Sequence, residues 1–191
     1  MLENKKNVLF DMDGLLIDSE SLGVEIWKKV FEKAGEPLIE EAAYKTIGSN
    51  GLAAQEILEE LTGDRNYFER YTKEFSEEKE NHLKEHPMPV KKGAHELLTY
   101  LKDHGYTIVL TSSTYYPKVM LSLKSAGLDQ YFDKFVCGDH VTRAKPDPEI
   151  FNKAIELYNL DKDETFILED SINGIKAADA AGIDVIGVPD L

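Results

Sequence analysis

The second half of the sequence alternates between short apolar runs and longer amphipathic segments. The runs "YTIVLTSS", "KFVCGD", "TFILED" and "DVIGV" are rich in branched or aromatic residues and are expected to be strands. The segments "YPKVMLSLKSAG", "DPEIFNKAIELY" and "SINGIKAADAAG" lie between them and carry apolar residues at helical spacing. Strands that alternate with helices across short turns pair in parallel, with helices on both faces of the sheet. The pattern therefore predicts an α/β fold with a Rossmann-like, three-layer parallel-sheet core.

Another apolar run stands apart near the N-terminus. "NVLF" predicts a buried strand, but only helical patterns follow it until "HPMPVKKG", whose prolines and glycine indicate a linker. We therefore expect residues 1–16 and 90–191 to form the core domain and residues 17–89 to form an inserted, all-helical cap domain. In the segment "DPEIFNKAIELY" we expect Asp147 to be the N-cap and Pro148 the first helical residue.

Polar side chains follow four of the predicted strands. They are Asp11 and Asp13 after the first strand, Ser112 and Ser113 at the second, Lys145 after the third, and Glu169 and Asp170 at the fourth. Ligands of open parallel sheets bind beyond the carboxyl ends of the strands, so these residues are expected to share one crevice. Converging carboxylates raise one another's pKa, and a hard divalent cation such as Mg²⁺ resolves that conflict. Lysine and hydroxyl groups suit phosphate oxygens, so the set predicts a site for phosphoryl transfer.

The motifs "FDMDGLLIDSE", "LTSS", "KPDPEIF" and "LEDSINGIKAADAAG" occur in this order. They resemble the four ordered motifs of the haloacid dehalogenase superfamily. The helical segment between the first two resembles the cap of its β-phosphoglucomutase-like phosphatase branch, so the resemblance covers essentially the whole chain. It implies a Mg²⁺-dependent phosphatase that hydrolyses a small phosphorylated metabolite through an aspartyl-phosphate. Members of that branch usually continue past the "GVPDL" position with one more strand and a terminal helix.

The resemblance also implies roles for the residues that match the motifs. Asp11 would be the nucleophile, and Asp13 would be the general acid and then the base. Ser112 and Lys145 would hold the transferring phosphoryl group, with Lys145 also pairing with Asp11. Ser113 is a further candidate for phosphate binding.

The metal site implied by the resemblance lies between the first and fourth motifs. Mg²⁺ would bind the carboxylates of Asp11 and Asp170 and the backbone carbonyl of Asp13. Glu169 would act from further out, through a metal-bound water.

Two positions in the predicted cap depart from the family's pattern. Gly23 stands where many close relatives carry a histidine, and Gly51 stands at the approximate position of an arginine in β-phosphoglucomutases. That arginine grips the second phosphate of a sugar bisphosphate, so its replacement favours a phosphatase over a phosphohexomutase, which is the alternative. Asn50 and Ser49 are then the polar residues of this loop that could contact the substrate.

A signalling receiver is a more remote alternative, because receivers also combine an acidic metal site, a phosphorylatable aspartate, a hydroxyl and a lysine. Receivers place the phosphorylated aspartate on a later strand and have no cap insert. Here the paired aspartates follow the first strand, and a long helical segment follows them.

Charge and composition narrow the partners and the location. A formal net charge of −14 repels a phosphate polymer, so nucleic acid is not an expected partner. No window approaches the roughly 18 uncharged apolar residues of a membrane span, and the N-terminus lacks the apolar region of a signal peptide. The single Cys137 cannot form an internal disulfide, which fits a reducing compartment. We expect a cytoplasmic monomer whose partner is its substrate.

Overall fold

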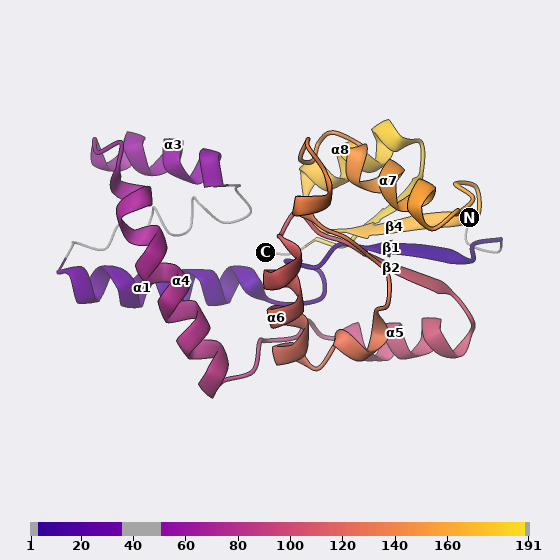
Figure 1. Cartoon of the computed structure of the whole chain (residues 1–191), viewed down its shortest axis with the longest axis horizontal. Coiled ribbons are helices and arrows are strands. Elements are labelled where there is room, and N and C mark those ends of the chain that lie inside the picture. The colour runs from indigo at the N-terminus through magenta and orange to yellow at the C-terminus, as the bar shows by residue number, and fades with distance from the viewer. Residues whose placement is uncertain (1–3, 36–50, 190–191) are drawn as a thin grey trace. The chain divides into compact units, whose positions relative to one another are not determined.

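The computed structural model describes residues 4–35 and 51–189, and the chain forms two compact units (Figure 1). One unit consists of Met1–Asp18 and Met88–Leu191, and the other consists of Ser19–Pro87. Among the helices of the described ranges, none combines the length and the apolar character needed to cross a membrane.

The larger unit is built on a parallel sheet of five strands. They are β1 (Asn7–Phe10), β2 (Thr107–Thr111), β3 (Phe135–Val136), β4 (Thr165–Glu169) and β5 (Asp184–Gly187). Their order in the sheet is β3-β2-β1-β4-β5, which places β1 at the centre. This is the Rossmann order, whereas receivers share the flavodoxin-like order 2-1-3-4-5. The strand order therefore argues against the receiver alternative.

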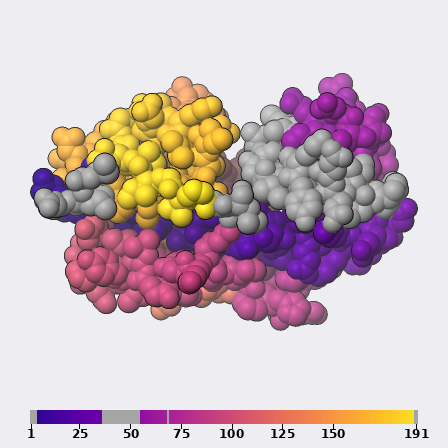
Figure 2. All heavy atoms as spheres, turned by 180° about the vertical axis from the view of Figure 1, so that it is seen from behind, coloured from indigo at the N-terminus to yellow at the C-terminus, as the bar shows by residue number. Residues whose placement is uncertain are grey.

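Helices cover both faces of this sheet, as Figure 1 shows. The helices are α5 (Ala94–Asp103) and α6 (Tyr116–Ala126) on one face, and α7 (Glu149–Leu157) and α8 (Ile172–Ala181) on the other. Leu9, Val109 and Ile167 are buried with residues of α7 and α8, such as Phe151 and Ala177. The intervening strand residues point to the α5 and α6 face, because side chains alternate along a strand. The predicted three-layer α/β fold is confirmed. The C-terminal part of the chain lies on the surface of this unit (yellow in Figure 2).

Helix α7 begins one residue later than the sequence pattern predicted. Pro148 is the N-cap, so the expected N-cap residue, Asp147, lies one position further out. Asp147 Oδ1 still accepts a hydrogen bond from the backbone N–H of Glu149, at 3.0 Å. The aspartate therefore satisfies a donor of the first helical turn, as a capping residue does.

Strand β3 is shorter than the run "KFVCGD" suggested, because a 3₁₀ turn over Gly138–His140 follows it. Gly138 lies directly against the chain that follows β2. Its backbone N–H donates to the carbonyl of Thr114 at 3.0 Å, and a Cβ at this position would overlap the carbonyl oxygen of Ser113. Glycine is therefore the residue that allows this close backbone approach.

The smaller unit is helical in its described residues. Its helices are α1 (Ser19–Ala34), α3 (Gly51–Thr62) and α4 (Tyr67–Glu85). Aromatic side chains join α1 to α4: Trp27 stacks on Phe75 with 4.5 Å between ring centroids, and Phe31 lies 5.6 Å from Tyr71. Such pairs add to the apolar burial that holds two amphipathic helices together.

Candidate functional site

The sheet register brings the ends of three strands to one level. Phe10 of β1 pairs with Leu110 of β2 and with Leu168 of β4. The next residues along these three segments are Asp11, Thr111 and Glu169, which therefore meet at the carboxyl edge of the sheet. The backbone N–H of Asp11 donates to the carbonyl of Leu168 at 3.0 Å, which fixes the first aspartate to the fourth strand.

Lys145 joins these strand ends. Its Nζ donates to Asp11 Oδ1 at 2.6 Å and to the Thr111 carbonyl at 3.3 Å, and it also donates to Glu169 Oε1. The side chains of Lys145, Asp11 and Glu169 are 6%, 10% and 0% exposed. The ammonium group also lies 5.1 Å from the centroid of the Phe151 ring. The structure thus brings together three of the predicted site residues in one buried ionic network.

Electrostatics at this network favour an additional cation. Burial raises the pKa of Asp11 above its ordinary value, the charges of Glu169 and Asp13 raise it further, and Lys145 opposes them. For Lys145, burial lowers the pKa, but Asp11 and Glu169 outweigh it, so its pKa is raised and the ammonium stays charged. One ammonium therefore balances two buried carboxylates while Asp13 adds further negative charge, an arrangement that is costly without a counterion.

The first turn of α8 holds Glu169. Glu169 Oε2 accepts hydrogen bonds from the backbone N–H of Ser171 (3.0 Å) and from its hydroxyl (2.9 Å). The Ser171 hydroxyl in turn accepts from the backbone N–H of Gly174 at 3.0 Å. A Cβ at Gly174 would overlap the Glu169 carboxylate, so glycine is needed inside this helix. Both oxygens of Glu169 are thus engaged within the protein: Ser171 holds Oε2, and this orients Oε1 toward Lys145.

Sequence reasoning missed Ser171 and Gly174. Their signal was present in "DSINGIK", where a serine precedes an apolar helical pattern that contains a glycine. A glycine inside a helical pattern is destabilising unless packing requires it, and here it marks a close approach.

Asp13 lies just beyond the buried network and is half-buried. Its Oδ2 accepts a hydrogen bond of 2.9 Å from the hydroxyl of Thr114, a residue that the sequence did not single out. The chain then turns away at Gly14, whose φ is 80°, a left-handed conformation that favours glycine. The only signal for Thr114 was that its hydroxyl extends the polar run "TSST" after the second strand.

The two predicted serines occupy different environments. Ser112 is buried, and its hydroxyl accepts a hydrogen bond from the backbone N–H of Thr114 at 3.1 Å. Ser113 is exposed and lines a cavity of about 210 Å³ together with Tyr115, Arg143 and Lys145. Ser112 therefore shapes the loop beside the buried network, while Ser113 faces the adjoining cavity.

The remaining predicted residues fall at the edges of what the structure describes. Asp170 follows Glu169 directly at the end of β4 and is partly buried. Asn50 lies outside the described residues, as does Ser49. Gly23 lies within α1, where a Cβ would have no atom within 4 Å.

The donors at the strand ends suit a metal with few protein ligands. Within residues 4–35 and 51–189, no three His, Cys, Asp or Glu side chains gather closely enough to hold a metal ion. The predicted set needs no such cluster, because it combines the carboxylates of Asp11 and Asp170 with the carbonyl of Asp13. Mg²⁺ usually binds one or two carboxylates, substrate phosphate and several waters. Oxygen donors with an excess of negative charge fit that cation.

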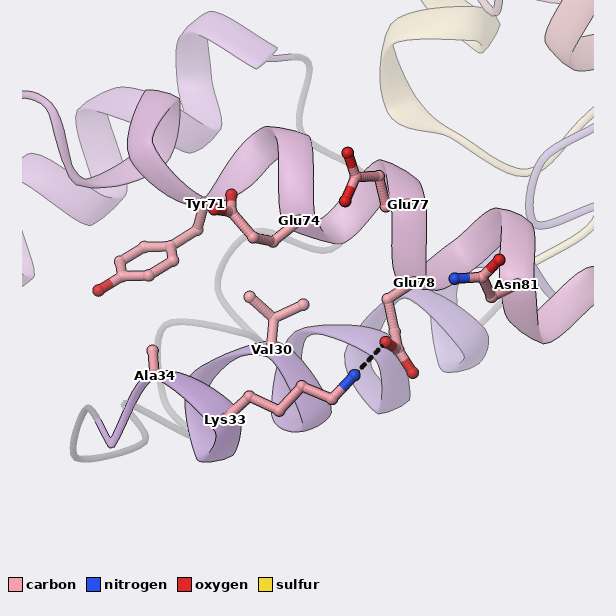
Figure 3. A pocket seen from close by; sticks show the side chains of 8 residues that line it. All are labelled: Val30, Lys33, Ala34, Tyr71, Glu74, Glu77, Glu78 and Asn81. Carbon is pink, nitrogen blue, oxygen red and sulfur yellow. Dashed lines mark hydrogen bonds and ion pairs between the residues drawn. The ribbon is translucent and has the colours of Figure 1, made fainter.

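A second cavity, of about 380 Å³, lies between α1 and α4 in the helical unit (Figure 3). Glu74, Glu77 and Glu78 line it, and Lys33 forms an ion pair with Glu78 across the two helices. Three carboxylates against one ammonium repel an anionic ligand. This cavity is therefore unsuited to a phosphorylated substrate.

Comparisons with known proteins identify the family of this chain. Residues 8–188 match the sequence model of the haloacid dehalogenase-like hydrolases. The phosphorylated carbohydrates phosphatase of Thermotoga maritima is 34% identical over 183 residues, which cover 94% of this chain and 82% of that protein. YhcW of Bacillus subtilis, provisionally named a phosphatase, is 32% identical over 185 residues, covering 96% of this chain and 83% of that protein.

A solved structure has the same fold. A Thermotoga maritima protein provisionally assigned as a beta-phosphoglucomutase aligns with a TM-score of 0.82 and 33% identity, over 97% of this chain and 87% of that chain. The resemblance inferred from the four motifs is thereby confirmed, and the chain belongs to the haloacid dehalogenase-like hydrolase family.

Proposed function

We propose that this hydrolase is a phosphatase that releases phosphate from a small phosphorylated carbohydrate. The observation that carries the proposal is the contact of Lys145 with both Asp11 and Glu169 at the carboxyl edge of the sheet. In this arrangement the Asp11 carboxylate can act as a nucleophile, and the Lys145 ammonium that holds it can also hold a phosphoryl group. The name of the Thermotoga maritima relative supports carbohydrate phosphates as the substrate class.

In the proposed first step, an Asp11 carboxylate oxygen attacks phosphorus and the bond from phosphorus to the leaving oxygen breaks. Asp13 gives its proton to the leaving oxygen. Lys145 and Ser112 hold the oxygens of the transferring phosphoryl group, and Ser113 contacts the substrate from the adjoining cavity. The product of this step is an aspartyl-phosphate on Asp11 and the released alcohol.

In the second step, a water molecule attacks the phosphorus of the aspartyl-phosphate and gives a proton to Asp13. The bond from phosphorus to Asp11 breaks, so inorganic phosphate leaves and both aspartates return to their starting state. The general acid of the first step is the general base of the second, which keeps the proton count balanced.

Mg²⁺ is the proposed cofactor, held by the carboxylates of Asp11 and Asp170 and by the backbone carbonyl of Asp13. When bound, it supplies positive charge that offsets the negative charge of the carboxylates and of the phosphoryl oxygens. Glu169 is expected to influence this site through water, in addition to its contacts with Lys145 and Ser171.

We further propose that residues 17–89 act as a cap domain over the core domain of residues 1–16 and 90–191. A closing cap excludes water from the reacting groups and selects the substrate. Asn50 belongs to the part of this cap that would contact the substrate. We also propose a cytoplasmic monomer, on the basis of the single cysteine, which fits a reducing compartment.

The test is to measure inorganic phosphate released from a panel of phosphorylated carbohydrates, with Mg²⁺ and with a chelator, in the wild type and in Asp11→Asn. We expect release that needs both Mg²⁺ and Asp11. Conversion of β-glucose 1-phosphate to glucose 6-phosphate in the presence of a sugar bisphosphate, without net phosphate release, would instead support the phosphohexomutase. If Asp11→Asn releases as much phosphate as the wild type, Asp11 is not the nucleophile.

A further inference from the structure

A threonine hydroxyl contacts the carboxylate that lies beside the buried network. Thr114 Oγ1 donates to Asp13 Oδ2 at 2.9 Å, although the two residues are 101 positions apart in the sequence. We infer that Thr114 is a positioning residue, which holds Oδ2 so that the other carboxylate oxygen, Oδ1, exchanges the proton with the substrate. This inference rests on the proposed function, in which Asp13 is the general acid and base.

Thr114 is itself held from two sides. Its backbone N–H donates to the Ser112 hydroxyl at 3.1 Å, and its backbone carbonyl accepts from the N–H of Gly138 at 3.0 Å. The close approach at Gly138 leaves no space for a Cβ beside the carbonyl of Ser113. A β-branched side chain on a backbone fixed in this way has few rotamers, so its hydroxyl is well placed for one hydrogen bond.

Asp13 depends on such a contact more than Asp11 does. Asp11 is buried and tied to Lys145, whereas Asp13 is half-buried and precedes the turn at Gly14. A carboxylate at such a position gains orientation from each hydrogen bond that it makes. A proton donor must lie within hydrogen-bond reach of the leaving oxygen in the reactive geometry, so a loss of orientation lowers the rate of proton transfer.

The chemistry of the first step gives a specific consequence. Asp11 attacks phosphorus, the bond to the leaving oxygen breaks, and the proton passes from Asp13 Oδ1 to that oxygen. A carbohydrate alkoxide is a poor leaving group and needs the proton, whereas p-nitrophenolate leaves as a stable anion without it. The value of kcat/KM reports the steps up to release of the leaving group, so it isolates this proton transfer from the later attack by water.

The experiment compares kcat/KM for a carbohydrate phosphate and for p-nitrophenyl phosphate in the wild type, Thr114→Val and Thr114→Ser. Valine has the shape of threonine without the hydroxyl, and serine keeps the hydroxyl. Since general acid catalysis contributes about 10²–10⁴-fold, we expect Thr114→Val to lose about 10–100-fold with the carbohydrate phosphate and less than about threefold with p-nitrophenyl phosphate. Thr114→Ser should retain the wild-type ratio between the two substrates.

A series of substituted phenyl phosphates gives a second measurement. In Thr114→Val the plot of log kcat/KM against leaving-group pKa should fall more steeply than in the wild type. An equal loss with every ester, or no loss with any, would overturn the positioning role. Circular dichroism melting of each variant identifies a folding defect. If Thr114→Val does not fold, Thr114→Ser decides: the wild-type ratio of kcat/KM between the two substrates supports the inference, and a ratio shifted against the carbohydrate phosphate contradicts it. If the wild type releases phosphate from neither substrate class, the proposed function and this role both fail.

Discussion

Asp11 and Lys145 are 134 positions apart in the sequence, and their side chains form a buried ion pair of 2.6 Å at the end of the central strand. The same ammonium also reaches Glu169, so one lysine holds two carboxylates that water cannot stabilise. The loop that carries Lys145 is therefore tied to the ends of β1 and β4 by ion pairs. The stability of this region depends on the same groups that the proposed chemistry uses.

Replacing Lys145 with methionine should reduce both stability and activity. The substitution leaves the buried carboxylates of Asp11 and Glu169 without their cation, and breaking a buried pair costs about 3–5 kcal/mol. Urea denaturation measures the free energy of unfolding, and phosphate release measures the activity. Lys118→Met, at an exposed position of α6, is the matched control and should change the free energy of unfolding by less than about 0.5 kcal/mol. Equal stability of the two variants would contradict the buried network.

Replacing Gly174 with alanine should destabilise the protein even though alanine favours helices. The new Cβ would overlap the Glu169 carboxylate, and such overpacking costs about 1–3 kcal/mol. Gly23→Ala is a matched control, because Gly23 also lies in a helix but has open space around its Cβ position. That variant should be stabilised by about 0.5–1 kcal/mol. Thermal melting of both variants gives the comparison, and a stabilised Gly174→Ala would contradict the account of how Glu169 is held.

Glu149 should make the stability of the larger unit depend on pH. Hydrogen bonds from the backbone N–H and hydroxyl of Thr142 and from Arg143 hold the pKa of Glu149 at about 2. Because this pKa lies below its ordinary value of 4.5, the contribution is present above about pH 4.5 and is lost as the pH falls toward 2. Glu149→Gln should therefore be less stable than the wild type at pH 7.

When both are measured by urea denaturation from pH 7 to pH 3, the difference in unfolding free energy between wild type and Glu149→Gln should stay constant down to about pH 4.5 and narrow at lower pH. Glu156→Gln, at an exposed position of the same helix, serves as the control. A gap that stays constant over this range would rule out the proposed linkage.

Cys137 should be unreactive in the folded protein. It is fully buried, and burial raises the pKa of its thiol to about 12, so almost no thiolate forms at pH 8. Mass spectrometry after treatment with iodoacetamide at pH 8 should show little alkylation in buffer and complete alkylation in concentrated guanidinium chloride. Rapid alkylation of the native protein would show that the thiol is accessible.

The sequence determined the order of strands and helices and the identity of the residues that end each strand. Apolar periodicity is a local property, so runs such as "NVLF" and "TFILED" predicted their strands without knowledge of their partners. The same periodicity indicated that Asp11 and Glu169 lie at the ends of strands. Parallel pairing of those strands then predicted that both residues lie at the carboxyl edge of the sheet. Helix α7 shows the limit of local reasoning, because it begins one residue beyond the start that the cap pattern suggested.

Tertiary structure alone decided which atoms pair at that edge. Glu169 contacts Lys145, and the hydroxyl of Thr114 contacts Asp13, because strand register and loop conformation bring residues that are distant in the sequence within 3 Å. No sequence period encodes such contacts, since they depend on rotamers and on the space available around each group. Gly174 illustrates the reason: its role follows from the position of a carboxylate that the helical pattern does not contain.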